Sequence, residues 1–235
     1  MTISVTLDWQ RVISPSEFDQ GANRDFLMSN GGTYIWIFKG TPYRVTYVGE
    51  TKVFANRFVD HFSSILTGRW NTYDMDEGDD FVKFLYEHYH DKTLDEIRAK
   101  NKCFIPNQPH KPSFSFRKTF FEDTCLITHR RYLKNLAFAF AACDTLEDSN
   151  IRKQVEGILI VGLRRLYAEY VEDKKIKSLR SKESRSYDIP IGNVSRKPTD
   201  SFTISHVGDA VNDIPEDVVK IIGFDFKRRQ PVFAH

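Results

Sequence analysis

The sequence contains no apolar run of eighteen or more residues, which is the minimum that a membrane-spanning helix needs. Its first twelve residues, MTISVTLDWQRV, also lack the basic start and apolar segment of a secretory signal. These two absences predict a cytoplasmic protein without a membrane partner.

Paired cysteine motifs are missing as well. The three cysteines are Cys103, Cys125 and Cys143, and no two of them form a CxxC pair. An odd, widely spaced set supports neither a zinc ribbon nor a disulfide framework, so free thiols are expected.

The chain has little net charge, formally +2 over 235 residues. Bulk electrostatics therefore does not indicate a nucleic-acid-binding protein, and only local clusters of basic residues can do so. What the chain has in quantity is aromatic residues, with 19 Phe and 10 Tyr. This composition predicts a well-filled core in one large domain, or in a domain with a sizeable insertion.

Two short segments near the N-terminal third predict a β-hairpin. The run TYIWIF (33–38) and the run YRVTYVG (43–49) are rich in β-branched and aromatic residues and flank a turn-forming cluster. Pairing Phe38 with Tyr43 across a four-residue turn places Tyr34 directly opposite Tyr47, with their Cβ atoms roughly 5 Å apart. Two phenols beside Gly49 could form a polar pocket, or they could simply stabilise the hairpin by packing.

The next segment, residues 52–66, has apolar residues at helical spacing. Arg57 and His61 are four residues apart and therefore share one face of this helix, beside its apolar stripe. Arg57 could hold a phosphate through two parallel hydrogen bonds. The alternatives are a surface arginine and a structural histidine, which are the commoner cases for each residue taken alone.

A later helix, predicted from about residue 150 to 175, contains an acidic residue in an unexpected place. At 100° per residue, Leu163 and Tyr167 lie within ~20° of Glu156, so the carboxylate falls in the middle of the apolar arc. A buried carboxylate needs a compensating metal ion, an arginine or protonation. Between these elements, residues 67–120 look like an insertion with a helix at roughly 79–100, and the apolar run 135–143 suits a central strand or a helix.

Together these residues resemble the GIY-YIG endonuclease family. The first signature of the family appears as Gly32-Thr33-Tyr34-Ile35-Trp36 and the second as Tyr47-Val48-Gly49, with eleven residues between Ile35 and Tyr47. Arg57 follows Tyr47 by ten residues and His61 follows Arg57 by four, as in the family. The metal-binding glutamate of the family is matched by Glu156 in Glu156-Gly157-Ile158-Leu159-Ile160.

The resemblance covers residues 31–66 and 135–170, and it departs from the family at two points. Threonine replaces the middle residue of the first triad. The asparagine expected about a dozen residues after the glutamate is also missing, since position 168 is Ala, and Asn193 is assigned to its place.

The resemblance implies an α+β fold with a small central, mostly antiparallel sheet flanked by helices, a helical insertion and a C-terminal extension. The division expected is an N-terminal extension at 1–30, the nuclease-like domain at 31–200 with its insertion at about 67–120, and an extension at 201–235 packed on the same domain.

The resemblance also implies a metal-dependent endonuclease that hydrolyses phosphodiester bonds in DNA. Glu156 would bind Mg²⁺, with Mn²⁺ as a substitute, and Arg57 would neutralise the phosphate. Tyr34 and Tyr47 would position or deprotonate the attacking water, and His61 would orient a tyrosine or relay the proton. Which tyrosine acts as the base stays open.

Basic residues outside this set are the expected DNA contacts, although each could equally be a solvated surface residue. The expected contacts are Arg130, Arg131, Lys134, Arg196 and Lys197, with the runs 174–185 and 227–229 as further basic stretches. A restriction or defence enzyme acting as a homodimer is favoured. The alternatives are a repair, mobile-element or RNA-directed nuclease, and a catalytically silent nucleic-acid- or protein-binding module.

Overall fold

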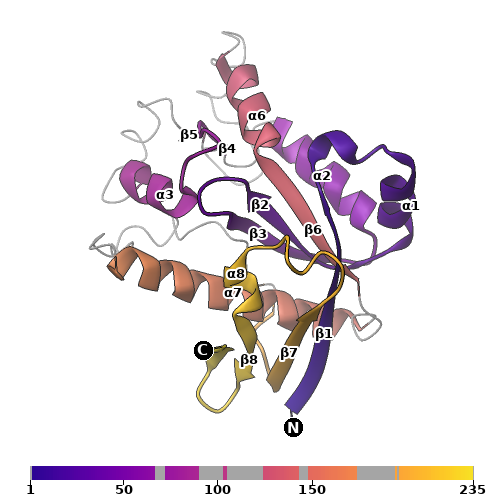
Figure 1. Cartoon of the computed structure of the whole chain (residues 1–235). Coiled ribbons are helices and arrows are strands. Elements are labelled where there is room, and N and C mark those ends of the chain that lie inside the picture. The colour runs from indigo at the N-terminus through magenta and orange to yellow at the C-terminus, as the bar shows by residue number, and fades with distance from the viewer. Residues whose placement is uncertain are drawn as a thin grey trace.

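The structure is a computed structural model that describes residues 2–66, 72–89, 103–104, 124–142, 148–173, 194 and 196–234. Within these residues it has a curled seven-stranded sheet, a two-stranded sheet and six α-helices, so the predicted α+β class is confirmed (Figure 1). The large sheet runs, in spatial order, β3 (Arg44–Thr51), β2 (Gly32–Phe38), β6 (Leu136–Ala142), β1 (Thr2–Ile13), β7 (Ser201–Val207), β8 (Ile221–Asp225) and β9 (Gln230–Phe233). Only the β1–β7 pair is parallel, so the sheet is mostly antiparallel as predicted but larger than the small sheet expected.

The helices connect these strands and cover the sheet (Figure 1). They are α1 (Gly21–Ser29), α2 (Phe54–Leu66), α3 (Phe81–Tyr89), α6 (Thr124–Lys134), α7 (Ser149–Asp173) and the short α8 (Glu216–Val219), with a 3-10 turn at Pro15–Glu17. No described helix is both long and apolar enough to cross a membrane.

The predicted hairpin is present as β2 and β3, but its predicted register is wrong. Tyr34 lies opposite Gly49, and Tyr47 lies opposite Trp36, so the two tyrosines are diagonal neighbours. The reason is a longer connection, since Phe38 pairs with Arg44 rather than Tyr43, together with a register shift between Trp36 and Ile37 that leaves an extra residue in β3.

The apolar run 135–143 contains β6, which pairs with both β1 and β2, so the strand prediction is confirmed over the helical alternative. Large aromatic residues of β6, Phe138 and Phe140, contact Phe18, Phe54 and Phe58. The alternate positions of β6 are alanines, which leave room on the other side of the sheet, where α7 lies (Figure 1). Both faces of β2 and β6 are therefore buried.

Residues 2–13, left without a predicted structure, form a strand in the middle of the sheet. β1 pairs antiparallel with β6 and parallel with β7, with Thr2 beside Ser201 and Asp8 beside Val207. In this half of the sheet burial alternates along the strands, as in a sheet with one solvated face. Val5 and Leu7 are buried, whereas the hydroxyl residues Ser4 and Thr6 are exposed.

The segment expected as an insertion is described only in part. Its first part contains α3, where a helix was predicted at 79–100, and residues 90–100 lie outside the described residues. The short strands β4 (Thr72–Tyr73) and β5 (Cys103–Phe104) pair with each other. The predicted helix from 150 to 175 is confirmed as α7 over the residues described.

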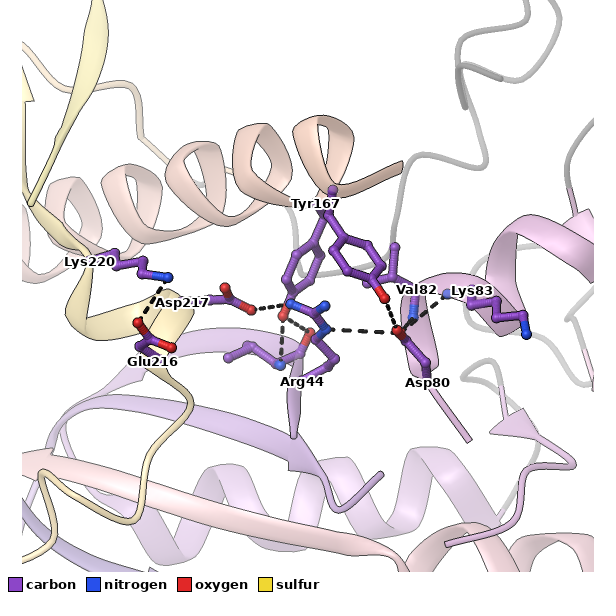
Figure 2. Close-up of polar contacts among 10 residues, drawn as sticks. Arg44, Asp80, Val82, Lys83, Tyr167, Glu216, Asp217 and Lys220 are labelled. Atoms are coloured by element: carbon purple, nitrogen blue, oxygen red, sulfur yellow. Dashed lines mark hydrogen bonds and ion pairs between the residues drawn. The ribbon is translucent and has the colours of Figure 1, made fainter. Parts of the chain in front are cut away.

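A buried cation holds the start of β3 against three other elements. The Arg44 side chain, 6% exposed, lies between Asp217 of α8, 2.5 Å from Nη1, and Asp80 before α3, 3.9 Å from Nε (Figure 2). Its guanidinium also lies 4.3 Å from the ring centre of Tyr170 of α7, whose hydroxyl donates to Asp80. These contacts link the hairpin, the first part of the insertion, α7 and the C-terminal segment.

Candidate active site

Tyr34 lies across β3, the edge strand of the sheet, because Gly49 has no side chain. A Cβ atom at Gly49 would overlap the Tyr34 ring, within 2.8 Å of Cε1 and closer still to Cζ and the hydroxyl. The glycine of the Tyr47-Val48-Gly49 signature thus has a steric reason in this fold: it lets the Tyr34 hydroxyl reach over the strand that contains Tyr47.

Tyr34 and His61 form a short, buried hydrogen bond. The Tyr34 hydroxyl lies 2.5 Å from His61 Nε2, and the direction of donation depends on the histidine tautomer. Burial and, to a lesser extent, the positive charge of Arg57 lower the pKa of His61 to about 3. The imidazole is therefore neutral near pH 7 and can accept a proton at Nε2 when its other nitrogen is protonated.

Tyr47 is the more exposed of the two phenols and lies beside Tyr34. Their ring centres are 6.1 Å apart. Burial raises the pKa of both hydroxyls, which are therefore protonated at neutral pH. The three groups form a chain from half-buried Tyr47 through Tyr34 to His61.

Trp36, which the sequence reasoning did not assign to the site, packs against this chain. Its ring centre lies 4.7 Å from that of His61 and 5.4 Å from that of Tyr47. Trp36 is two residues after Tyr34 in the same strand, so the side-chain alternation of a strand was the available signal.

Arg57 lies at the border between this cluster and solvent. Its side chain is 51% exposed and forms a long, exposed ion pair with Asp60, at 3.8 Å. Its charge nevertheless acts on Tyr34, Tyr47 and His61, opposing the rise of both phenol pKa values and lowering the pKa of the imidazole. A guanidinium at this place can accept an anion from solvent while influencing the buried groups.

Glu156 is buried on α7, as its position in the apolar arc predicted, and is 6% exposed. Its negative charge contributes to the raised pKa of both Tyr47 and Tyr34, and its helix α7 packs on the strands β3 and β2 that contain them. Residues from two strands and two helices thus meet at one place, namely Tyr34, Tyr47, Arg57, His61 and Glu156.

The donors present suit a hard cation held by few protein ligands. Among the residues described, no three His, Cys, Asp or Glu side chains gather as a metal cluster. A buried carboxylate next to neutral hydroxyls fits Mg²⁺, which usually keeps several waters and binds through one or two carboxylates. Glu156 is the residue of this set that would hold such an ion.

The basic residues expected to contact DNA divide into two groups. A Cβ atom at Gly157 would lie 2.6 Å from the carbonyl oxygen of Arg196, so the segment with exposed Arg196 and Lys197 passes directly beside Gly157, the residue after Glu156. The α6 residues lie elsewhere, because α6 leads into β6 at Leu136, opposite Phe38. That position is ~13 Å along the sheet from Tyr34.

Within the α6 group, Arg130 and Lys134 are exposed, whereas Arg131 is paired with Asp74 at 2.8 Å. His129, the first residue of that basic run, is buried and does not face solvent. Asn193 lies outside the described residues.

No family model, no curated protein and no solved structure matches the chain.

Proposed function

We propose that the chain is a metal-dependent endonuclease of the GIY-YIG type that hydrolyses phosphodiester bonds in DNA. The main support is the convergence of Tyr34, Tyr47, Arg57, His61 and Glu156, which come from separate elements of the sequence. A packing role alone gives no reason to collect a neutral imidazole, two protonated phenols, a half-exposed guanidinium and a buried carboxylate.

The proposed proton path starts at the phenol that solvent reaches. Tyr47 takes the proton of the attacking water as its own proton passes to Tyr34, and Tyr34 passes its proton to His61 Nε2. Neither phenol has to exist as a free phenolate, which its raised pKa would disfavour. Neutral His61 is the final acceptor.

The substrate itself assists this path through Arg57. A phosphate held by the guanidinium cancels part of the positive charge that lowers the pKa of His61. Substrate binding therefore makes the imidazole a stronger base, and Arg57 also stabilises the charge that develops on the phosphoryl oxygens.

Glu156 would hold Mg²⁺ beside the phenols, and Mn²⁺ is a plausible substitute. When bound, such an ion supplies charge neutralisation for the phosphate and for the departing oxygen. Arg196 and Lys197, whose segment passes beside Gly157, would hold the flanking backbone of the DNA, with Arg130 and Lys134 of α6 as more distant contacts.

We further propose double-strand cleavage at specific sites, as in a restriction or defence enzyme. One chain provides one cluster, so cutting both strands of a symmetric site calls for a homodimer.

The decisive experiment compares the wild type with Glu156→Gln on supercoiled plasmid and on structured RNA, with Mg²⁺ and with EDTA. We expect discrete DNA fragments from the wild type with Mg²⁺ only, and a loss of at least about three orders of magnitude in the variant, because metal charge stabilisation contributes several kcal/mol. Circular dichroism and salt-dependent DNA binding should remain close to the wild type.

Cleavage retained by Glu156→Gln would overturn the assignment. Preferential cutting of RNA would redirect the proposal to an RNA-directed nuclease, and absence of any product would favour a silent binding module.

A further inference from the structure

Helix α7 is attached to the edge strand β3 at two separate points, and Glu156 lies between them. α7 also packs on β2, β8 and β9. The two polar attachments fix the position of α7 along β3.

The first attachment is a buried ion pair. Arg152 Nε lies 3.0 Å from Glu50 Oε2, and the two side chains are 5% and 14% exposed. Glu50 directly follows Gly49 in β3, and Arg152 is one helical turn before Glu156. The pair is therefore ~6 Å along the helix from the carboxylate at the candidate site.

The second attachment is a tyrosine that pairs with the free edge of β3. The Tyr167 hydroxyl accepts a hydrogen bond from the Val45 amide, at 2.7 Å, and donates to the Val45 carbonyl, at 3.2 Å. Tyr167 is fully buried, and Figure 2 shows it descending from α7 onto the start of β3 beside Arg44.

These contacts fix both the direction and the register of the helix. Position 152 contacts position 50, and position 167 contacts position 45, so α7 runs antiparallel to β3. Glu156 lies between the two attachments on the helix, and Tyr47 lies between them on the strand. The carboxylate is thus aligned with the phenol by contacts that include neither residue.

We propose that Glu50, Arg152 and Tyr167 are positioning residues that hold Glu156 beside Tyr47 and Tyr34, in the place where it binds a divalent cation. This inference rests on the proposed function for the identity of the ligand. Arg152 and Tyr167 lie outside the nuclease signatures, and Glu50 directly follows the second one.

The direction in which Arg152→Gln changes the affinity for Mn²⁺ distinguishes a positioning role of Arg152 from a purely electrostatic one. Arg152→Gln removes a positive charge next to the cation site, which by Coulomb's law alone should tighten binding of Mn²⁺. If the arginine positions Glu156, the same variant should instead weaken Mn²⁺ binding by about 10- to 100-fold, as loss of an outer-shell contact does.

The measurement is paramagnetic broadening of the ¹³C-labelled tyrosine ring signals of Tyr34 and Tyr47 during titration with Mn²⁺, without DNA. We expect broadening in the wild type, none in Glu156→Gln, and a shift to higher Mn²⁺ concentrations in Arg152→Gln and, by less, in Tyr167→Phe. The swapped pair Glu50→Arg with Arg152→Glu should restore wild-type binding. Arg165→Gln, which breaks the exposed pair with Glu169 on the same helix, is the matched control and should behave as the wild type.

If folded Arg152→Gln binds Mn²⁺ as tightly as the wild type or more tightly, the positioning role is overturned and the proposed function stays intact. Should Arg152→Gln not fold, unchanged binding in Tyr167→Phe together with no recovery in the folded swap would overturn it. Absence of broadening in the wild type would overturn the metal site and the positioning together.

Discussion

The two ends of β3 contain buried polar clusters of opposite character. At its start, Arg44 lies between two carboxylates and over a tyrosine ring, so each buried charge is close to an opposite charge. Further along, Tyr34, Tyr47 and His61 form a cluster of neutral groups whose pKa values are moved away from their ordinary ranges by burial.

The two clusters differ in what they contribute to the stability of the fold and to function. A buried ion pair resists change, and its disruption is expensive because it leaves an uncompensated charge. Burial opposes ionisation of the groups with displaced pKa values, and such groups are typical of functional sites. The start of β3 thus belongs to a cluster suited to stabilising the fold, whereas Tyr47 of the same strand belongs to a cluster suited to catalysis.

The largest effect is expected from a substitution in the cluster of Tyr34, Tyr47 and His61. Tyr34→Phe should lower the cleavage rate by about 10²- to 10⁴-fold, because the variant removes the middle member of the proton path. Single-turnover cleavage at saturating Mg²⁺ measures the effect. The matched control is Tyr132→Phe, which removes another buried tyrosine hydroxyl without touching the cluster. Equal losses in the two variants would contradict the path.

The second effect is on the stability of the fold and concerns Arg44 at the start of β3. Arg44→Ala should lower the free energy of unfolding by about 3–5 kcal/mol, since Asp80 and Asp217 lose their buried cation. Urea denaturation measures the change, and cleavage by the folded fraction at low temperature should stay close to wild type. Arg165→Ala, at an exposed ion pair, should cost less than about 1 kcal/mol. A folded Arg44→Ala enzyme that has lost cleavage would argue that the two ends are not separate.

The smallest effect is a pH dependence of stability caused by buried neutral histidines. Burial lowers the pKa of His61 to about 3 and that of His129 to about 4, whereas both titrate near 6.5 when unfolded. Between these values the unfolded chain binds more protons, so stability falls as pH decreases below about 6.5. Each histidine should contribute about 2 kcal/mol of loss between pH 6.5 and pH 5.

Urea midpoints at pH 7, 6 and 5 test this expectation, with His61→Gln as the comparison. The variant should be less sensitive to acid than the wild type, because it lacks one of the groups that take up a proton on unfolding. An unchanged slope would mean that His61 is not held neutral by the fold.

The sequence was sufficient to predict the elements that contain the candidate site. The hairpin, α2, β6 and α7 each have a local periodic pattern, and Glu156 stands out because it interrupts one. The register of the hairpin was not predictable, since the length of the connection after Phe38 and the extra residue in β3 depend on tertiary packing.

Two features were not predicted: the strand β1, which does have a pattern in the sequence, and the Glu50–Arg152 pair, which has none. Val5, Leu7 and Trp9 alternate with polar residues in β1, which is the pattern of a strand with one solvated face. By contrast, the Glu50–Arg152 pair joins residues a hundred positions apart, and neither residue is unusual in its local sequence. Such a pair becomes visible only when α7 is placed on β3.

The parallel pairing of β1 with β7 has a consequence for biosynthesis. Residues 2–8 pair in parallel with residues 201–207, so during translation β1 is made long before this neighbour exists. The β2–β3 hairpin and α2 can form from nearby contacts, whereas pairing of β1 with β7 must wait until residues 201–207 have left the ribosome. Until then the edge of β1 that faces β7 is open to pairing with other nascent chains, which makes chaperone protection of this strand a practical concern in recombinant expression.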